Sequence, residues 1–216
     1  MLELSGLAEA VRARLEAKHQ ARELALRESR HATRCSANAI RATHRGEYGG
    51  ALALLAEAEA ALQAARAACA DEPEVEFAGF LADAQKEYAE ARTTYAIVTG
   101  ASLPGPDELD MRDAAWLGGL AETVGELRRQ LLDVLRAGHL ERCEELLESM
   151  DDIYSLLVTI DFPDGITGGL RRATDIARSI IERTRGDLTN ALVQARLRDA
   201  LDAHRTDLLG SALPGE

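Results

Sequence analysis

The sequence predicts an all-α protein, a bundle of six or seven helices in a single domain that covers residues 1–216. Three observations indicate this class. Apolar residues recur at helical rather than alternating spacing, Val and Ile never cluster between turn signals, and Gly and Pro gather at a few points that divide the chain. No segment has the composition of a flexible linker, so we expect one domain.

The first helix is expected to start near Leu7 and to run past Ile40, because neither Pro nor Gly occurs between them and Gly46 is the first break. A helix of about 35 residues is already ~50 Å long at 1.5 Å per residue. A bundle of this size does not need such a length. We therefore expect the helix either to kink or to pack its ends against something outside the monomer, which favours oligomerisation.

The later helices are expected between the remaining breaks, at residues 51–70, 74–99, 108–136, 140–160 and 167–209. The first of these segments consists almost entirely of Ala, Leu, Glu and Gln, which are strong helix formers. Pro73 suits the first turn of the next helix, and Asp107 can cap the helix that follows the loop at residues 100–106. The tail from about residue 210 is expected to fray.

The net charge of the chain is relevant to whether it can bind nucleic acid. The chain carries 37 acidic and 25 basic residues, for a net charge of −12, which at face value argues against nucleic acid. Lys18 and Lys86 are the only lysines, alanine is abundant, and aromatic residues make up 4%. This composition resembles that of proteins from salt-in halophilic archaea or high-GC bacteria. In molar salt the Debye length is about 3 Å, so the net charge does not exclude nucleic acid.

Several classes of protein lack support in the sequence. No run of about 18 apolar residues occurs, and the N-terminus has no signal-peptide pattern. Cys35, Cys69 and Cys143 are widely spaced without a CxxC pair, which argues against a disulfide framework or a zinc knuckle. His139 and Cys143 share one helical face, but no further soft ligand is near in sequence. We expect a cytoplasmic protein with no membrane partner.

Two pairs of glutamates lie beside apolar stripes, each pair on one helical face. Glu87 and Glu90 are spaced i, i+3, and Glu122 and Glu126 are spaced i, i+4 with Gly125 between them, which leaves room for a ligand to approach. If the two helices pack face to face, four carboxylates meet, and a divalent cation relieves their repulsion. Such oxygen ligands suit Mg²⁺ or Mn²⁺, whose waters can attack a phosphodiester. The alternative is an ordinary solvated acidic face.

Arginines gather along the first helix, one turn after the second acidic pair, and at the start of the last helix. A guanidinium group binds phosphate through two hydrogen bonds, so an arginine-rich inner face could hold a nucleic-acid backbone. The alternative is salt bridging within helices. The candidate nucleic-acid-binding residues are Arg30, Arg34, Arg128, Arg129, Arg171 and Arg172. Of these, we expect Arg128 or Arg129 to clamp the substrate phosphate.

Five segments, taken in chain order, resemble the translin superfamily, that is, translin and translin-associated factor X. Residues 21–46 resemble the family's opening helix, KEYAEA at 86–91 is similar to a QEYVEA stretch of factor X, and GLAETVGEL at 119–127 is similar to its GVADLTGEL. LRAGH at 135–139 and RTRG at 183–186 match two shorter family motifs. The similarity extends over nearly the whole chain.

The resemblance implies seven-helix protomers that assemble into a hollow octamer around single-stranded RNA or DNA. Factor X carries the acidic residues of a Mg²⁺-dependent endoribonuclease, whereas translin lacks the full set and binds nucleic acid. Those acidic residues fall on Glu87, Glu90, Glu122 and Glu126. Glu122 replaces an aspartate of factor X. Its longer side chain moves the carboxylate by about 1.5 Å, which alters the metal geometry without abolishing ligation.

Because both acidic pairs are retained, the resemblance predicts an endoribonuclease that uses Mg²⁺, with Mn²⁺ as the other option. It would act on single-stranded RNA or DNA inside a homo-oligomeric shell, with a homo-octamer as the expected form. In such a shell the acidic residues can face solvent while arginines line the interior. Two alternatives stay open: a non-catalytic, translin-like binding protein, and a helical scaffold without nucleic acid.

Overall fold

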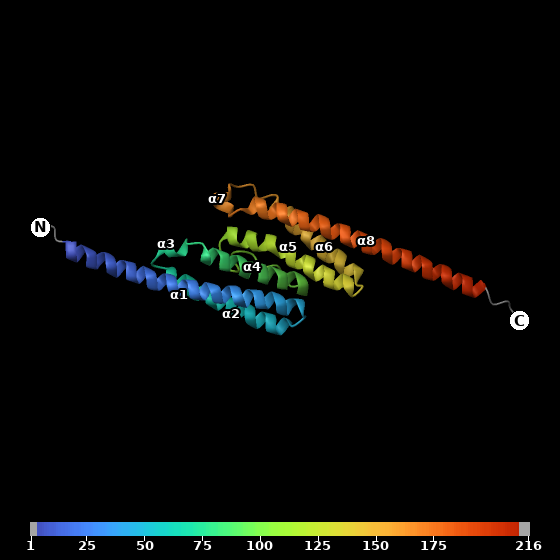
Figure 1. The fold of residues 1–216 in the computed structure, drawn as a ribbon, viewed down its shortest axis with the longest axis horizontal. Helices are drawn as coiled ribbons and strands as arrows, with labels where there is room; N and C mark the ends of the chain where they lie inside the picture. The colour runs from blue at the N-terminus through green and yellow to red at the C-terminus, as the bar shows by residue number, and fades with distance from the viewer. Residues whose placement is uncertain (1–3, 212–216) are drawn as a thin grey trace.

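The computed structural model describes residues 4–211, and these fold into helices with no strand among them (Figure 1). The predicted all-α class is therefore confirmed. Six of the described helices are long, and two, α3 and α7, are single turns of four residues. In chain order the helices are α1 (Leu4–His44), α2 (Tyr48–Cys69), α3 (Pro73–Glu76), α4 (Phe80–Thr99), α5 (Asp113–Arg136), α6 (Leu140–Leu157), α7 (Asp164–Thr167) and α8 (Leu170–Ser211).

Three predicted helices begin or divide at other residues than expected. The helix predicted at residues 167–209 begins instead at Leu170, because Gly168 and Gly169 have positive φ values of 64° and 84° and Thr167 ends the short α7. The helix predicted at residues 74–99 is divided into α3 and α4, because Gly79 between them has a φ of 90°. This left-handed conformation suits glycine and interrupts a helix. The helix predicted from residue 108 begins instead at Asp113, after a turn in which Asp110 has a φ of 47°.

The long helices lie in three neighbouring groups (Figure 1). α1 and α2 pack together on one side, α4 and α5 lie in the centre, and α6 and α8 cover the other side of α5. One apolar core, which includes Leu55 and Tyr88, lies between α1, α2 and α4. A second core, which includes Leu127, Leu131 and Met150, lies between α5, α6 and α8. The contact between α4 and α5 therefore joins the two apolar cores.

The backbones of α4 and α5 approach each other closely. A Cβ atom on Gly119 of α5 would lie 2.5 Å from the carbonyl oxygen of Lys86 and 2.8 Å from the amide nitrogen of Glu90, both on α4. A larger residue would push the helices apart, so glycine is required here. The buried hydroxyl groups of Thr93 and Thr123 meet at 2.5 Å in the same contact. This contact fixes α4 and α5 relative to each other beside the predicted glutamates.

The N-terminal part of α1 and the C-terminal part of α8 extend beyond the bundle at opposite ends (Figure 1). With 41 residues, α1 has the length that was expected of the first helix. These extensions expose apolar side chains such as Leu7 and Leu15 on α1, and Leu197 and Leu201 on α8. Within the described chain no helix combines the length and apolar composition needed to span a bilayer. The tail that was expected to fray lies largely outside the described residues.

Candidate metal centre between the central helices

Three of the predicted glutamates come together where α4 meets α5. Carboxylate oxygens of Glu87 and Glu90 on α4 and of Glu122 on α5 all lie within 4.8 Å of one another. The spacing of three residues places the first two on one face of α4. The close approach at Gly119 brings that face onto α5. The face-to-face arrangement expected of the two acidic pairs is therefore present for these three residues.

The fourth predicted ligand, Glu126, has a different set of partners. Its Oε2 accepts a hydrogen bond from Nε2 of His44 at 2.5 Å, and Nη1 of Arg129 lies 3.7 Å from the same oxygen. The His44 side chain is only 4% exposed, and its Nδ1 lies 2.9 Å from Oε1 of Gln130. His44, at the end of α1, thereby fixes the orientation of the Glu126 carboxylate.

The contact between His44 and Glu126 favours the charged form of both groups. The hydrogen bond from His44 lowers the pKa of Glu126, although burial acts in the opposite direction. Burial lowers the pKa of His44, but the hydrogen bonds with Glu126 and Gln130 outweigh it, so the net pKa is raised above its ordinary value. Glu126 thus has a compensating positive charge within the chain, which distinguishes it from Glu87 and Glu90.

Glu90 has the most strongly perturbed environment of the four. Burial makes the largest contribution, the charges of Glu122, Glu87 and Glu126 add to it, and together they raise the pKa of Glu90 to about 8. The pKa of Glu87 is raised as well, first by burial and then by Glu122. A divalent cation among these oxygens would relieve the repulsion. Because the donors are all carboxylate oxygens, the group fits Mg²⁺ or Mn²⁺.

Sequence reasoning missed Lys86 and His44 as members of the site. Nζ of Lys86 lies 2.6 Å from Oε1 of Glu122, at the more exposed edge of the group. Burial lowers the pKa of Lys86, but the bond to Glu122 outweighs it and the net pKa is raised. The rarity of lysine in this chain was the one signal that singled out Lys86. His44 lies 82 residues from Glu126, so no local spacing could pair them.

The two arginines that follow the second acidic pair point to different places. Arg128 donates a hydrogen bond to Oγ1 of Thr184 and another to Oδ2 of Asp187, each at 2.8 Å, and so ties α5 to α8. Arg129 is more exposed and lies beside Glu126. Of the two expected phosphate clamps, Arg129 is therefore the one that the fold places at the carboxylates.

The other predicted phosphate-binding arginines are exposed and lie on α1 and α8. They are Arg30, Arg34, Arg171 and Arg172. Arg30 and Arg34 line a groove between α1 and the start of α4, and Arg171 pairs with Asp161 at 3.2 Å. Within residues 4–211 none of the four forms an ion pair with the predicted carboxylates. The fold therefore does not bring these arginines into the carboxylate group of the same chain.

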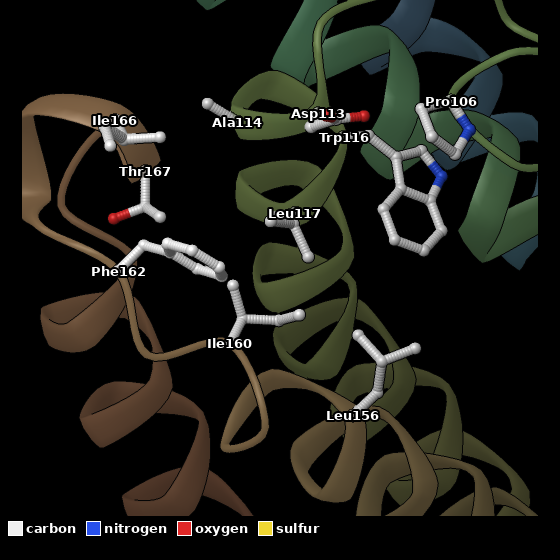
Figure 2. A pocket seen from close by; sticks show the side chains of 10 residues that line it. All are labelled: Pro106, Asp113, Ala114, Trp116, Leu117, Leu156, Ile160, Phe162, Ile166 and Thr167. Carbon is white, nitrogen blue, oxygen red and sulfur yellow. The ribbon is translucent and has the colours of Figure 1, made fainter.

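A separate apolar groove lies between α5 and the segment that connects α6 to α8 (Figure 2). It encloses about 460 Å³, and Figure 2 shows Leu117, Leu156, Ile160 and Phe162 around it. Asp113 is the one carboxylate in its lining. This groove lacks clustered charges, so the carboxylate group remains the better candidate for a metal site.

Comparisons with known proteins agree with this arrangement of helices. No protein-family model matches the chain. An uncharacterised protein of Methanocaldococcus jannaschii is 35% identical over 127 residues, which cover 58% of this chain and 57% of that protein. The match thus spans little more than half the length of this relative.

Solved structures match over a longer part of the chain. C3PO of Archaeoglobus fulgidus in complex with duplex RNA is 36% identical, with a TM-score of 0.81, over 88% of this chain and 98% of that one. A second crystal structure of the same protein gives a TM-score of 0.80 with the same identity and coverage. Apo C3PO of Nematostella is 21% identical, with a TM-score of 0.75 over 88% of this chain, and this likeness concerns the fold alone.

Proposed function

The chain belongs to the translin superfamily, and we propose that it is a metal-dependent endoribonuclease of the C3PO type. The observation that carries the proposal is the group of three carboxylates between α4 and α5, with ligand oxygens within 4.8 Å of one another. Burial and the negative charges of the neighbouring glutamates raise the pKa of Glu90 to about 8. Superfamily membership supports the reading of this group as a reaction centre rather than a solvated acidic face.

Glu87, Glu90 and Glu122 would hold the cation, and Glu126 would complete the site from the next turn of α5. We propose Mg²⁺ as the natural ion and Mn²⁺ as a substitute, because both prefer oxygen ligands. When bound, the ion supplies positive charge that polarises a phosphodiester and activates water for its hydrolysis. The longer side chain of Glu122, where factor X has aspartate, remains compatible with this role because its oxygen reaches those of Glu87 and Glu90.

The other residues of the site act on substrate and ligands. His44 holds the Glu126 carboxylate through a hydrogen bond of 2.5 Å, so Glu126 keeps one orientation. Each glutamate of the second acidic pair has a basic neighbour. Lys86 forms an ion pair with Glu122, and Arg129 lies beside Glu126. Arg129 is exposed and Lys86 is partly exposed, and both positive groups can receive a phosphate of the nucleic-acid backbone.

RNA is the proposed substrate class. The C3PO of Archaeoglobus fulgidus that resembles this chain was solved with duplex RNA, and single-stranded RNA is the form that a nuclease of this type would cleave. We also propose that copies of this chain assemble into a closed shell, with a homo-octamer as the expected form. The apolar extensions of α1 and α8 support this assembly, since they have surface to bury against a second copy.

One observation favours a non-catalytic RNA-binding shell as the second candidate. Within the chain, Glu122 is already paired with Lys86 and Glu126 with His44. Two of the four carboxylates therefore have compensating charges without a metal ion. If these pairs persist when RNA binds, the protein holds RNA without cleaving it.

The test is cleavage of labelled single-stranded and duplex RNA with Mg²⁺, with Mn²⁺ and with EDTA, at low and at molar salt. We expect cleavage that EDTA abolishes and that Glu90→Gln reduces by more than about 1000-fold, since removal of a metal ligand removes several kcal/mol of transition-state stabilisation. Glu141→Gln, an exposed glutamate of α6, serves as the matched control and should cleave like the wild type. RNA binding without cleavage in every condition would leave the non-catalytic shell.

A further inference from the structure

A second group of metal-binding side chains lies between α1 and α2, outside the carboxylate site. His31 and Cys35 come from α1 and Glu57 from α2, and their ligand atoms all lie within 4.8 Å of one another. We propose that these three residues form a transition-metal site, with Zn²⁺ as the ion that fits best. The site does not depend on the proposed nuclease function, because it uses different residues and different donor chemistry.

The distances between the ligand atoms suit a single ion. Nε2 of His31 lies 3.0 Å from Oε1 of Glu57, and Sγ of Cys35 lies 3.9 Å from each ring nitrogen of His31. With Zn–S bonds of about 2.3 Å and Zn–N or Zn–O bonds of about 2.1 Å, tetrahedral geometry places N and S about 3.6 Å apart and N and O about 3.4 Å apart. The observed separations differ from these values by only a few tenths of an ångström.

The helix packing holds the three ligands in place. His31 and Cys35 are four residues apart and therefore share one face of α1. This face packs against α2 through small side chains, among them the fully buried Ala32 and Ala58. Ala58 directly follows Glu57, so the close contact of the two helices brings the Glu57 carboxylate to the His31 ring. An ion bound here would link α1 to α2 over the first apolar core.

The donor set separates this site from the carboxylate group. A thiolate and an imidazole are borderline or soft ligands that select Zn²⁺ and similar ions, whereas Mg²⁺ requires oxygen. A Cys35 thiolate and the Glu57 carboxylate together balance the charge of a divalent ion. Arg34 is the neighbouring cation, with Nη2 3.5 Å from Nδ1 of His31, and its side chain is exposed and can turn to solvent. Three protein ligands leave the fourth position for water or a small ligand.

The experiment uses Co²⁺ as a spectroscopic probe on the metal-free full-length chain. A Co²⁺ ion bound by a thiolate gives a sulfur-to-metal charge-transfer band and the intense visible bands of tetrahedral coordination. We expect these bands to saturate at one equivalent, to disappear on addition of Zn²⁺, and to persist in excess Mg²⁺. Cys35→Ser should abolish the charge-transfer band, whereas Cys143→Ser should retain it, because this buried cysteine belongs to no group of three potential metal ligands among the described residues.

Two further variants keep the test decisive if Cys35→Ser folds poorly. Glu57→Gln changes an exposed side chain, and His31→Gln a half-exposed one, so both should fold, and each should weaken Zn²⁺ binding by at least ~10-fold. Glu87→Gln should leave Co²⁺ and Zn²⁺ binding at this site unchanged. The proposal is overturned if wild-type protein shows no thiolate-to-cobalt band, if the band survives in Cys35→Ser, or if Glu57→Gln and His31→Gln bind Zn²⁺ like the wild type.

Discussion

The two groups of candidate metal ligands are built by the same structural device but differ in chemistry. In each, one helix presents two ligands one turn apart and a neighbouring helix adds a third. Between α4 and α5 all three ligands are carboxylates, and their repulsion raises the pKa of Glu90 to about 8. Between α1 and α2 the ligands are sulfur, nitrogen and oxygen, and His31 already pairs with Glu57.

This difference indicates how far the fold depends on an ion at each place. Three carboxylates that share one space need a positive charge or a proton, so the α4–α5 group is unsatisfied without one. The α1–α2 group has an internal hydrogen bond and a buried thiol, so it is stable as it stands. We therefore expect Mg²⁺ to change the electrostatics of the central helices strongly, and Zn²⁺ at the second group to add a link that folding does not require.

The largest expected effect comes from comparing the same substitution, glutamate to glutamine, in each of the two groups. Glu90→Gln should reduce RNA cleavage by more than about 1000-fold, because it removes one of the proposed ligands of the catalytic metal ion. Glu57→Gln should leave cleavage within about twofold of the wild type, because it touches only the second group. Parallel cleavage assays and Co²⁺ spectra on both variants measure this. Loss of cleavage in Glu57→Gln would mean that the two groups are coupled.

The second prediction concerns the contact that assembles the carboxylates. Gly119→Ala places a methyl group 2.5 Å from the Lys86 carbonyl oxygen, so α4 and α5 must separate. We expect the free energy of unfolding to fall by about 1–3 kcal/mol and cleavage to fall by about 100-fold, since small displacements of catalytic groups are costly.

Gly125→Ala is the matched control for Gly119→Ala, because a Cβ at residue 125 meets open space. Alanine is the better helix former, so this variant should be as stable as the wild type or more stable by up to about 1 kcal/mol. Urea denaturation of both variants separates the steric effect from helix propensity. Equal stability of the two variants would show that α4 and α5 are not in close contact at Gly119.

The third prediction concerns pH in the metal-free protein. The folded chain keeps the Glu90 proton up to a pH of about 8, whereas the unfolded chain releases it near the ordinary pKa of 4.5. Between these values the unfolded state binds fewer protons, so the free energy of unfolding should decrease as pH rises. We expect a decrease on the order of 2 kcal/mol, less than the full pKa difference would give because Glu90 is only partly buried.

Glu90→Gln and added Mg²⁺ provide the controls for this pH dependence. Glutamine cannot titrate, so the variant should lose the part of the decrease that is due to Glu90. The decrease due to His44, whose pKa is also raised, should remain. Mg²⁺ should flatten the wild-type profile by compensating the ionised carboxylates. Superimposable pH profiles for metal-free wild type and Glu90→Gln, measured by urea denaturation, would contradict the prediction.

Sequence periodicity was sufficient to predict the six long helices, though not all of their ends, and the ligands that share one helix. The spacing of Glu87 and Glu90 predicts a common face, and the structure has it. The break at Gly79 was missed, because a single glycine in a helical composition does not show whether it adopts a positive φ. Side-chain spacing also could not show that Gly119, rather than Gly125, is the glycine in close contact.

The remaining parts of both sites depend on contacts between distant segments. His44 and Glu126 are 82 residues apart, and no local pattern pairs them. The i, i+4 spacing of His31 and Cys35 is visible in the sequence, but Glu57 reaches them only because α2 folds back along α1. Sequence reasoning therefore identified candidate ligands on single helices, and the packing of the helices decided which of them meet.

The smallest expected effect tests whether His44 is a positioning residue for Glu126. His44→Leu removes the hydrogen bond to the Glu126 carboxylate, and we expect Mn²⁺ affinity at the central site to fall by about 10-fold, as for other residues that orient metal ligands. His44→Gln can still donate a hydrogen bond, so it should recover part of that loss. Calorimetric titration with Mn²⁺ measures this without any assay of cleavage. Co²⁺ binding at the α1–α2 group should be equal in both variants, because His44 lies outside it. Equal Mn²⁺ affinity in wild type and His44→Leu would show that Glu126 either needs no support or takes no part in holding the ion. The central site would then resemble the α1–α2 group, with three ligands that require no fourth.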